Sequence, residues 1–218
     1  SPLANNVAWV LAVEKLAGIE VPVRAQYIRM IVAELARIAS HLVAIGSFAM
    51  DVGALTVFLW TLREREKIMD IWDILCGARF TNSYTRIGGV ANDAQPEALA
   101  LVKKFIDANL SECESLLNTN RIFIERLDGV GVISKEVALS YGYTGPNLRA
   151  SGVEFDLRRA TPYLQYDKVD FRIPVFTEGD CLARYFVRAD EVRESAKIVK
   201  QCLQLMQPHS KSLVKGKF

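Results

Sequence analysis

The sequence predicts a mainly α protein, a bundle of four or five long helices with minor β elements. Two apolar seams support this prediction, because their members recur at alternating spacings of three and four residues and so share one helix face. The seams consist of Ile28, Ile31, Leu35, Ile38, Leu42, Ile45 and Ala49 and, later in the chain, of Leu182, Tyr185, Ala189, Val192, Ala196, Val199, Leu203 and Met206. Half of the residues are hydrophobic, which is ordinary for a subunit buried among partners.

The first three helices have clear boundaries in the sequence. A helix from Asn5 to Leu16 ends at Gly18, and Pro22 suits the first turn of the seam helix that follows. A third helix runs from about residue 55 to residue 75 and stops at Gly77. The faces of the seam helix outside the seam carry Arg24, Arg29, Glu34, Arg37 and His41.

Polar residues and Gly88-Gly89 predict a loop over residues 77–94. Asp93 is a candidate cap for the next helix, which has Pro96 in its first turn and reaches about residue 117. A short helix opens at Ser134 and ends near residue 142.

The C-terminal part is predicted from weaker signals. Residues 142–180 show little periodicity, so we expect an ordered loop region with one short strand at 171–175. The last helix begins at Asp180 and ends at Pro208. We therefore expect a helical core over residues 1–207 and an unstructured or truncated tail over residues 208–218.

Composition excludes several function classes. The 27 basic and 25 acidic residues leave a net charge of +2, which gives no reason to expect a nucleic-acid partner. The four cysteines stand far apart without a CxxC pair, so we expect no metal or cluster held by this chain alone. Reduced thiols fit a cytosolic or matrix compartment. The glycine pairs lack the strand–GxGxxG–helix context of a nucleotide site.

Asp51 is the only charged side chain between Leu42 and Leu62. That stretch is long enough to span a membrane. However, a charge at its middle costs ~3 kcal/mol, and Gly46 and Gly53 suggest a break. We therefore expect two buried helices that meet near residues 50–54. A carboxylate in such apolar surroundings must be paired, protonated or open to a cavity.

Two interpretations of Asp51 remain open from the pattern alone. In the structural one, its carboxylate caps the helix that begins near residue 55. In the functional one, it lines an apolar cavity, where it holds a histidine or takes part in proton transfer.

Other polar residues also allow two interpretations. Arg79 and Arg86 either bond loop carbonyls or face something negative, such as an anionic redox cluster or a carboxylate. The mixed charges of residues 63–67 indicate a solvated or intersubunit helix face. His41 has no second histidine three or four residues away, so we expect a satisfied, partly buried side chain rather than a metal ligand.

Several segments follow one another in an order typical of one family. They are EKLAGIEVPVRAQYIRMIVAELARIASHL, the D-x-G-A-x-T of Asp51 to Thr56, REREK, CGAR, YTRIGGV, TGPNLRASGVEFDLRR and GDCLARYFVR. In these segments the chain resembles the 49-kDa subunit, also called the D subunit, of proton-pumping NADH:quinone oxidoreductase, respiratory complex I. That family is related to the large subunits of nickel–iron hydrogenases. The resemblance extends over residues 1–207.

The resemblance implies a hydrogenase-like helical core that is a fragment of a longer subunit. It implies a place in the peripheral arm of complex I, on the cytoplasmic face of the bacterial plasma membrane or the matrix side of the mitochondrial inner membrane. There the 49-kDa subunit forms the quinone-reduction cavity with the B subunit, which holds the terminal 4Fe-4S cluster. The C subunit and the membrane-embedded H subunit are the other expected partners, and NADH is oxidised on a distant subunit.

Six positions acquire roles from the resemblance. Asp51, Thr56 and Phe58 match the quinone cavity, with Asp51 as the catalytic carboxylate. Arg79, Thr81 and Arg86 match the loop beside the partner's iron–sulfur cluster.

The chain departs from the family pattern in two respects. A quinone-contacting tyrosine and a histidine-bearing hairpin precede the position of Ser1 in the family. Many members carry histidine at the position of Thr81. Because this chain lacks that protonatable imidazole, we expect a weaker pH dependence of the reduction potential of the neighbouring cluster. A redox titration at several pH values measures it.

Two alternatives to complex I follow from the same residues. One is the large subunit of a membrane-bound nickel–iron hydrogenase. The other is a non-catalytic helical scaffold whose apolar faces only hold neighbouring subunits together.

Overall fold

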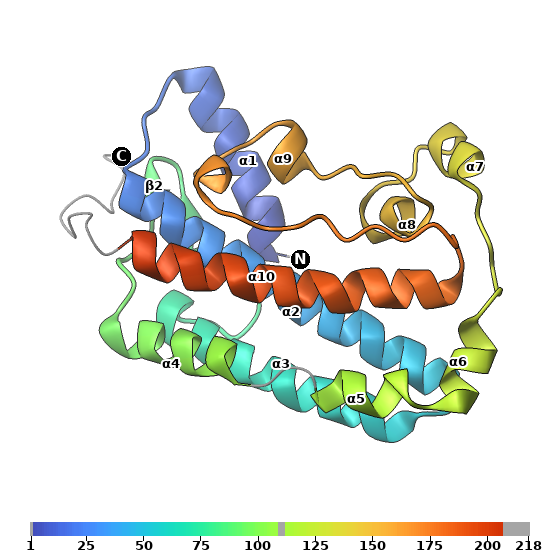
Figure 1. Ribbon diagram of the computed structural model, residues 1–218. Coiled ribbons are helices and arrows are strands. Elements are labelled where there is room, and N and C mark those ends of the chain that lie inside the picture. The colour runs from blue at the N-terminus through green and yellow to red at the C-terminus, as the bar shows by residue number, and fades with distance from the viewer. Residues whose placement is uncertain (1, 109–111, 207–218) are drawn as a thin grey trace.

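Helix α2 (Val23–Asp51) lies at the centre of the computed structural model, between α10 (Cys181–Leu205) and α3 (Leu55–Cys76) (Figure 1). The structure describes residues 2–108 and 112–206. Its other elements are α1 (Pro2–Ala17), β1 (Thr85–Arg86), β2 (Gly89–Val90), α4 (Pro96–Asp107), α5 (Glu112–Asn118), α6 (Arg121–Leu127), α7 (Lys135–Ser140), α8 (Gly145–Ala150), α9 (Leu157–Ala160) and the 3₁₀ helix η1 (Tyr166–Lys168). The predicted mainly α fold is confirmed.

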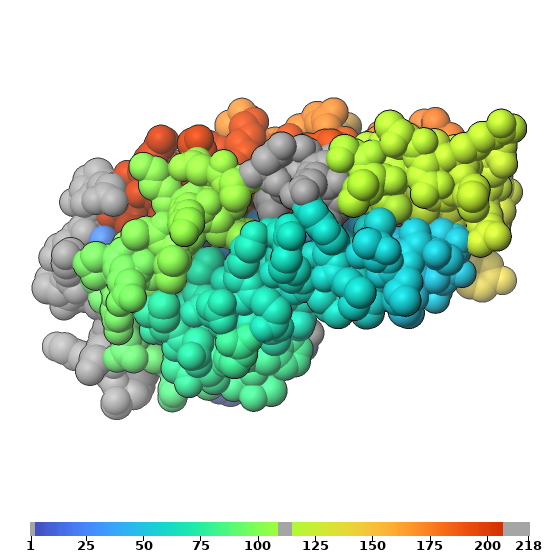
Figure 2. All heavy atoms as spheres, turned by 90° about the horizontal axis from the view of Figure 1, so that it is seen from below, coloured from blue at the N-terminus to red at the C-terminus, as the bar shows by residue number. Residues whose placement is uncertain are grey.

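The helices form a layered bundle around α2. From below, α3 runs along the molecule, with α4 at one end and α5 and α6 at the other (Figure 2). The segment that carries α8, α9 and η1 covers the opposite side, above α2 and α10 (Figure 1). The only regular strands in the described part of the chain, β1 and β2, pair antiparallel in a two-residue hairpin.

The two predicted seams form the core. All seven residues of the first seam are buried, and those of the second are buried or half-buried. Because α2 contacts α3 on one side and α10 on the other, the seams bring together segments more than 100 residues apart in sequence. Burial of these side chains is the main favourable contribution to folding.

The predicted break between α2 and α3 is confirmed. Helix α2 ends at Asp51, and Gly53 adopts φ +93° in the turn, a conformation that favours glycine. Within the described residues, no helix is long and apolar enough to cross a membrane. Gly46, however, does not break the helix; it lies inside α2, where its missing side chain allows α3 to approach closely.

Other predicted boundaries needed correction. Helix α4 ends at Asp107 because Ala108 is extended, and residues 112–118 form the separate helix α5. Asp93 does not cap α4, since its carboxylate binds Arg24 at 2.9 Å, and Gln95 takes the cap position without a side-chain bond. Helix α7 and its Ser134 cap are as predicted.

The loop region over residues 142–180 contains short helices instead of the predicted strand. No strand forms at 171–175 in the described structure, because the backbone N–H groups of Asp170 and Arg172 donate to side chains of α10 rather than to another strand. Asp180 caps α10 through the N–H of Ala183, as predicted. The predicted end at Pro208 and the predicted tail lie outside the described residues.

Replacing Gly46 with alanine tests the close packing of α2 and α3. A Cβ at this position falls on Thr61 Oγ1 and lies 3.1 Å from Phe58 Cδ2. We expect Gly46→Ala to lower the free energy of unfolding by about 1–3 kcal/mol through overpacking, although alanine normally favours a helix. Ser47→Ala, on the next, half-buried residue, should change it by less than about 0.5 kcal/mol. Urea unfolding of both variants measures this, and a stabilised Gly46→Ala protein would contradict the packing described here.

Candidate functional site

Asp51 is the last residue of α2 and is exposed to solvent. Within the described part of the chain, its carboxylate accepts no hydrogen bond and forms no ion pair. The turn after it is held by Arg126, whose Nη1 donates to the carbonyl of Val52 at 2.6 Å. Ala54 occupies the cap position of α3 without a side-chain bond, so the capping interpretation of Asp51 is wrong.

Of the three states expected for the Asp51 carboxylate, pairing is absent within the described residues, and the side chain is open to its surroundings. The helix ends at this residue, and its side chain projects into solvent instead of into the core. The surface around it is nevertheless apolar, since Leu55 and Leu59 are 56% and 59% exposed and Met50 is exposed as well. Large apolar side chains gathered beside one unpaired carboxylate are typical of a surface that something else covers.

The other two residues predicted for the quinone cavity lie on the first turn of α3. Thr56 is exposed beside the Asp51 turn, whereas Phe58 is half-buried and packs toward Gly46 of α2. Asp51 and Thr56 are therefore accessible to a ligand, and Phe58 also supports the helix packing.

The loop after α3 holds the second group of predicted residues. Arg79 is exposed, donates to Asp70 Oδ1 at 2.7 Å and pairs with Glu66, so two carboxylates of α3 already balance its charge. Arg86 donates to the carbonyl of Ser83 at 2.7 Å, in line with the structural interpretation of a loop-bonding arginine. Thr81 is exposed.

A buried ion pair fixes the hairpin that carries Arg86. Arg29 binds Glu14 of α1 at 2.6 and 3.0 Å and donates to the carbonyls of Arg86 and Gly89. Glu14 in turn accepts the N–H of Gly88 at 2.7 Å. The sequence placed Arg29 on an outer face, but the structure buries it completely.

The two predicted groups lie at opposite ends of α3. This helix has 22 residues, so it is about 33 Å long. Asp51 precedes its first turn and Arg79 follows its last one. The structure therefore places Asp51 and Thr56 at one end of α3 and Arg79 at the other, so it does not bring the two groups together.

Between these two ends, the core contains a charged network that the sequence did not reveal. Glu34 is fully buried and accepts hydrogen bonds from Arg158 at 3.0 Å, Tyr166 at 2.6 Å and Ser195 at 2.6 Å. Arg158 also binds Asp156 at 2.7 Å. The network joins α2 and α10 to the segment of residues 156–166, and its members are up to 161 residues apart.

The network holds its carboxylates ionised. Burial on its own would raise the pKa of Glu34, but the charges of Arg37 and Arg158 and two hydroxyl hydrogen bonds outweigh it and lower the pKa to about 2. Burial would likewise raise the pKa of Asp156, but the hydrogen bond and charge of Arg158 lower it to about 2.

A second buried cluster lies on the same side of α2. His41 Nε2 lies 2.6 Å from Glu191 Oε2, and Arg149 Nε donates to the other oxygen at 2.7 Å. Burial lowers the pKa of His41, despite the opposing effect of Glu191, so a neutral imidazole donates its Nε2–H to the carboxylate. His41 is thus a satisfied core residue, as predicted.

Among the described residues, no group of three or more His, Cys, Asp or Glu side chains is arranged to hold a metal ion.

Comparison with known proteins identifies the family. A family model described as "Respiratory-chain NADH dehydrogenase, 49 Kd subunit" matches residues 51–217. The chain belongs to this family. The resemblance inferred from the sequence is therefore confirmed, and of the two enzyme families considered, it is the NADH dehydrogenase subunit that matches.

Individual relatives agree with the family model. The chain is 58% identical to the NADH-quinone oxidoreductase D subunit of Salinibacter ruber, over 94% of this chain and 46% of that protein. It is 58% identical to a D subunit of Chloroherpeton thalassium, over 94% of this chain and 47% of that protein. It is 53% identical to the D subunit of Methylacidiphilum infernorum, over 95% of this chain and 50% of that protein. The chain thus spans about half the length of the curated relatives that it matches.

The core network makes a testable contribution to stability. We expect Arg158→Met to lower the free energy of unfolding by about 3–5 kcal/mol, because it leaves Glu34 and Asp156 buried without their guanidinium partner. Arg172 provides the control, since it pairs with Asp190 at 2.8 Å on the surface and Arg172→Met should cost less than about 1 kcal/mol. Denaturant unfolding of both variants measures the difference, and equal losses would exclude a special role for the buried network.

The lowered pKa of Glu34 predicts an acid dependence of stability. The unfolded carboxyl titrates near pH 4.5 and the folded one near pH 2, so the unfolded state binds the proton first as the pH falls. The stabilisation is complete above pH 4.5 and decreases progressively toward pH 2. We expect Glu34→Gln to be less stable than the unchanged protein at pH 7. Between pH 5 and pH 3, however, its free energy of unfolding should fall by a smaller amount, as measured by denaturant unfolding at each pH. Parallel curves for the two proteins would contradict this.

Proposed function

We propose that this chain acts as a core subunit of a proton-translocating NADH:quinone oxidoreductase and forms part of its quinone-reduction cavity at the Asp51 turn. One observation carries the proposal: the carboxylate of Asp51 is unpaired within the described residues, and the exposed apolar residues Met50 and Leu55 flank it along the chain. A quinone has an apolar ring and tail and two polar carbonyls, so it needs both kinds of surface. The relatives, which are named as subunits of NADH-quinone oxidoreductase, support the substrate class.

In this proposal each predicted residue has a separate task. The exposed faces of Leu55 and Leu59 exclude water from one side of the headgroup. Asp51 orients and charge-balances a histidine outside this chain, as a carboxylate that fixes an imidazole tautomer does. That histidine supplies a proton to the reduced quinone. Thr56 and Phe58 continue the cavity wall.

The second group of residues faces the source of electrons. We place Arg79, Thr81 and Arg86 near a 4Fe-4S cluster held by the neighbouring B subunit, and this chain contributes no cofactor of its own. The pairing of Arg79 with Glu66 and Asp70 reduces the positive charge that it presents. Arg86 keeps more of its charge available, because its Nε bonds only a carbonyl.

The partners and location follow from the same proposal. The B, C and H subunits would cover the exposed apolar side chains, in the peripheral arm on the cytoplasmic or matrix side of the membrane. NADH would be oxidised on a distant subunit.

Asp51→Asn in the complete subunit, studied in the assembled complex, tests this function. We expect quinone reduction to slow by about 10–100-fold, because the amide can no longer balance the charge of the histidine. NADH oxidation with an artificial acceptor should be unchanged, since that reaction does not reach the quinone. Asp73→Asn, on an exposed residue near the other end of α3, is the control and should leave both rates unchanged. Normal quinone turnover in Asp51→Asn would refute the assignment.

The scaffold alternative makes a different prediction. If the apolar faces only hold neighbouring subunits together, a photoreactive quinone-site inhibitor will not label residues 51–58. Labelling of that segment would exclude a purely structural role.

A further inference from the structure

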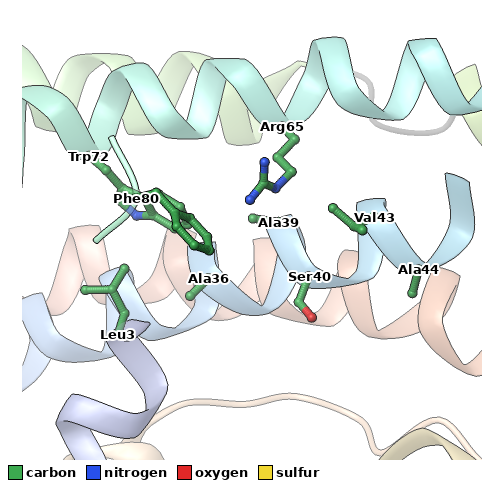
Figure 3. A pocket seen from close by; sticks show the side chains of 9 residues that line it. All are labelled: Leu3, Ala36, Ala39, Ser40, Val43, Ala44, Arg65, Trp72 and Phe80. Atoms are coloured by element: carbon green, nitrogen blue, oxygen red, sulfur yellow. The ribbon is translucent and has the colours of Figure 1, made fainter. Parts of the chain in front are cut away.

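A second apolar surface lies between α2 and α3, on the side of the fold where α1 begins. It is a half-open groove of about 360 Å³. Small side chains of α2 form its floor, and Trp72, Phe80 and Arg65 of α3 and the following loop line it from above (Figure 3). The small side chains are Ala36, Ala39, Ser40 and Ala44.

Arg65 differs from the cations around it. Arg63 and Lys67 both pair with Glu64, and Arg79 pairs with Glu66 and Asp70. Arg65 instead points from α3 toward α2 over the groove (Figure 3). It forms no ion pair with a carboxylate of the described residues. Its only contacts there are with Met69 Sδ, at 3.5 Å, and with the ring of Phe80, 5.4 Å from its centroid.

Trp72 lines the groove with its ring, while its indole N–H is buried beneath the surface. Its side chain is only 3% exposed, and its indole Nε1 has no acceptor within the described structure. A buried N–H without an acceptor is unfavourable. Arg65 and Ser40 are therefore the polar side chains on an otherwise apolar groove, and the guanidinium calls for an occupant that brings an acceptor.

We propose that this groove docks an apolar segment of a neighbouring subunit, and that the segment carries an aspartate or glutamate that pairs with Arg65. Charge complementarity selects this occupant, because a guanidinium at the edge of an apolar groove is best matched by a carboxylate. The small residues on α2 let the incoming backbone approach closely. The volume suits a few anchoring side chains rather than a whole helix. The inference rests on the proposed place of this chain in a multisubunit oxidoreductase.

A site-specific crosslink in the assembled complex tests the occupant. The photoreactive amino acid p-benzoylphenylalanine replaces Val43, which lines the groove, in a tagged, complete subunit. After purification of the complex and irradiation, mass spectrometry identifies the attached peptide. We expect one peptide from a different subunit, apolar and with an aspartate or glutamate. A crosslink to lipid, to quinone, to another part of the same subunit or to a peptide without an acidic residue would overturn the proposal.

Charge variants test the role of Arg65. Arg65→Met should lower the crosslink yield at least fivefold, whereas Arg63→Met, on the neighbouring paired arginine, should leave it within twofold. Arg65→Glu should abolish the crosslink, and replacing the identified acidic residue of the partner with lysine should restore it. Equal yields in the Arg65 and Arg63 variants would refute the ion pair.

The experiment also separates this inference from the proposed function. If the tagged subunit does not co-purify with NADH dehydrogenase activity, the proposed function fails and the docking inference fails with it. If it co-purifies and the groove position gives no intersubunit crosslink, only the docking inference is refuted.

Discussion

The buried ion pair between Glu34 and Arg158 is the interaction on which the rest of the structure depends. The apolar seams of α2 and α10 supply most of the burial, but smooth apolar faces can slide along one another by a turn. A buried carboxylate that loses its guanidinium is costly, so only one register of α2, α10 and the segment around Arg158 satisfies it. We infer that this network selects the register, and that the Arg29–Glu14 pair does the same for α1 and the hairpin.

This constraint explains how α2 serves two purposes. In its middle, the carboxylate of Glu34 and the imidazole of His41 are enclosed and hydrogen-bonded, so this part acts as a rigid support. At its end, Asp51 reaches solvent without a partner in the described structure. The backbone at this point is held by the end of α2 and by Arg126, which bonds the carbonyl of Val52 in the turn that follows.

The surfaces left incomplete lie along the same two helices. The Asp51 turn presents a carboxylate among exposed leucines, and the groove presents a guanidinium among alanines, two helical turns earlier on α2 at Ala44. Each surface combines exposed apolar area with one charge that has no partner among the described residues. The charge is negative at the Asp51 turn and positive in the groove. Exposed apolar area of this kind is unfavourable for an isolated domain, but it is expected on a subunit whose neighbours bury it.

Sequence alone determined the helical class, the two seams, the break near Asp51, the helix starts at Ser134 and Asp180 and the family, because each depends on residues close together in the chain. It misplaced Arg29 and Glu34 of α2 and the short strand, and it left open whether Asp51 caps α3. Only the tertiary structure decided these points. The partners of Glu34 and Arg29 lie far away in sequence, and a pattern of charges does not distinguish a solvated side chain from one that is paired and buried. The same limit applies to Arg65, which looks like its neighbours in sequence and differs from them only in forming no ion pair with a carboxylate of the described chain.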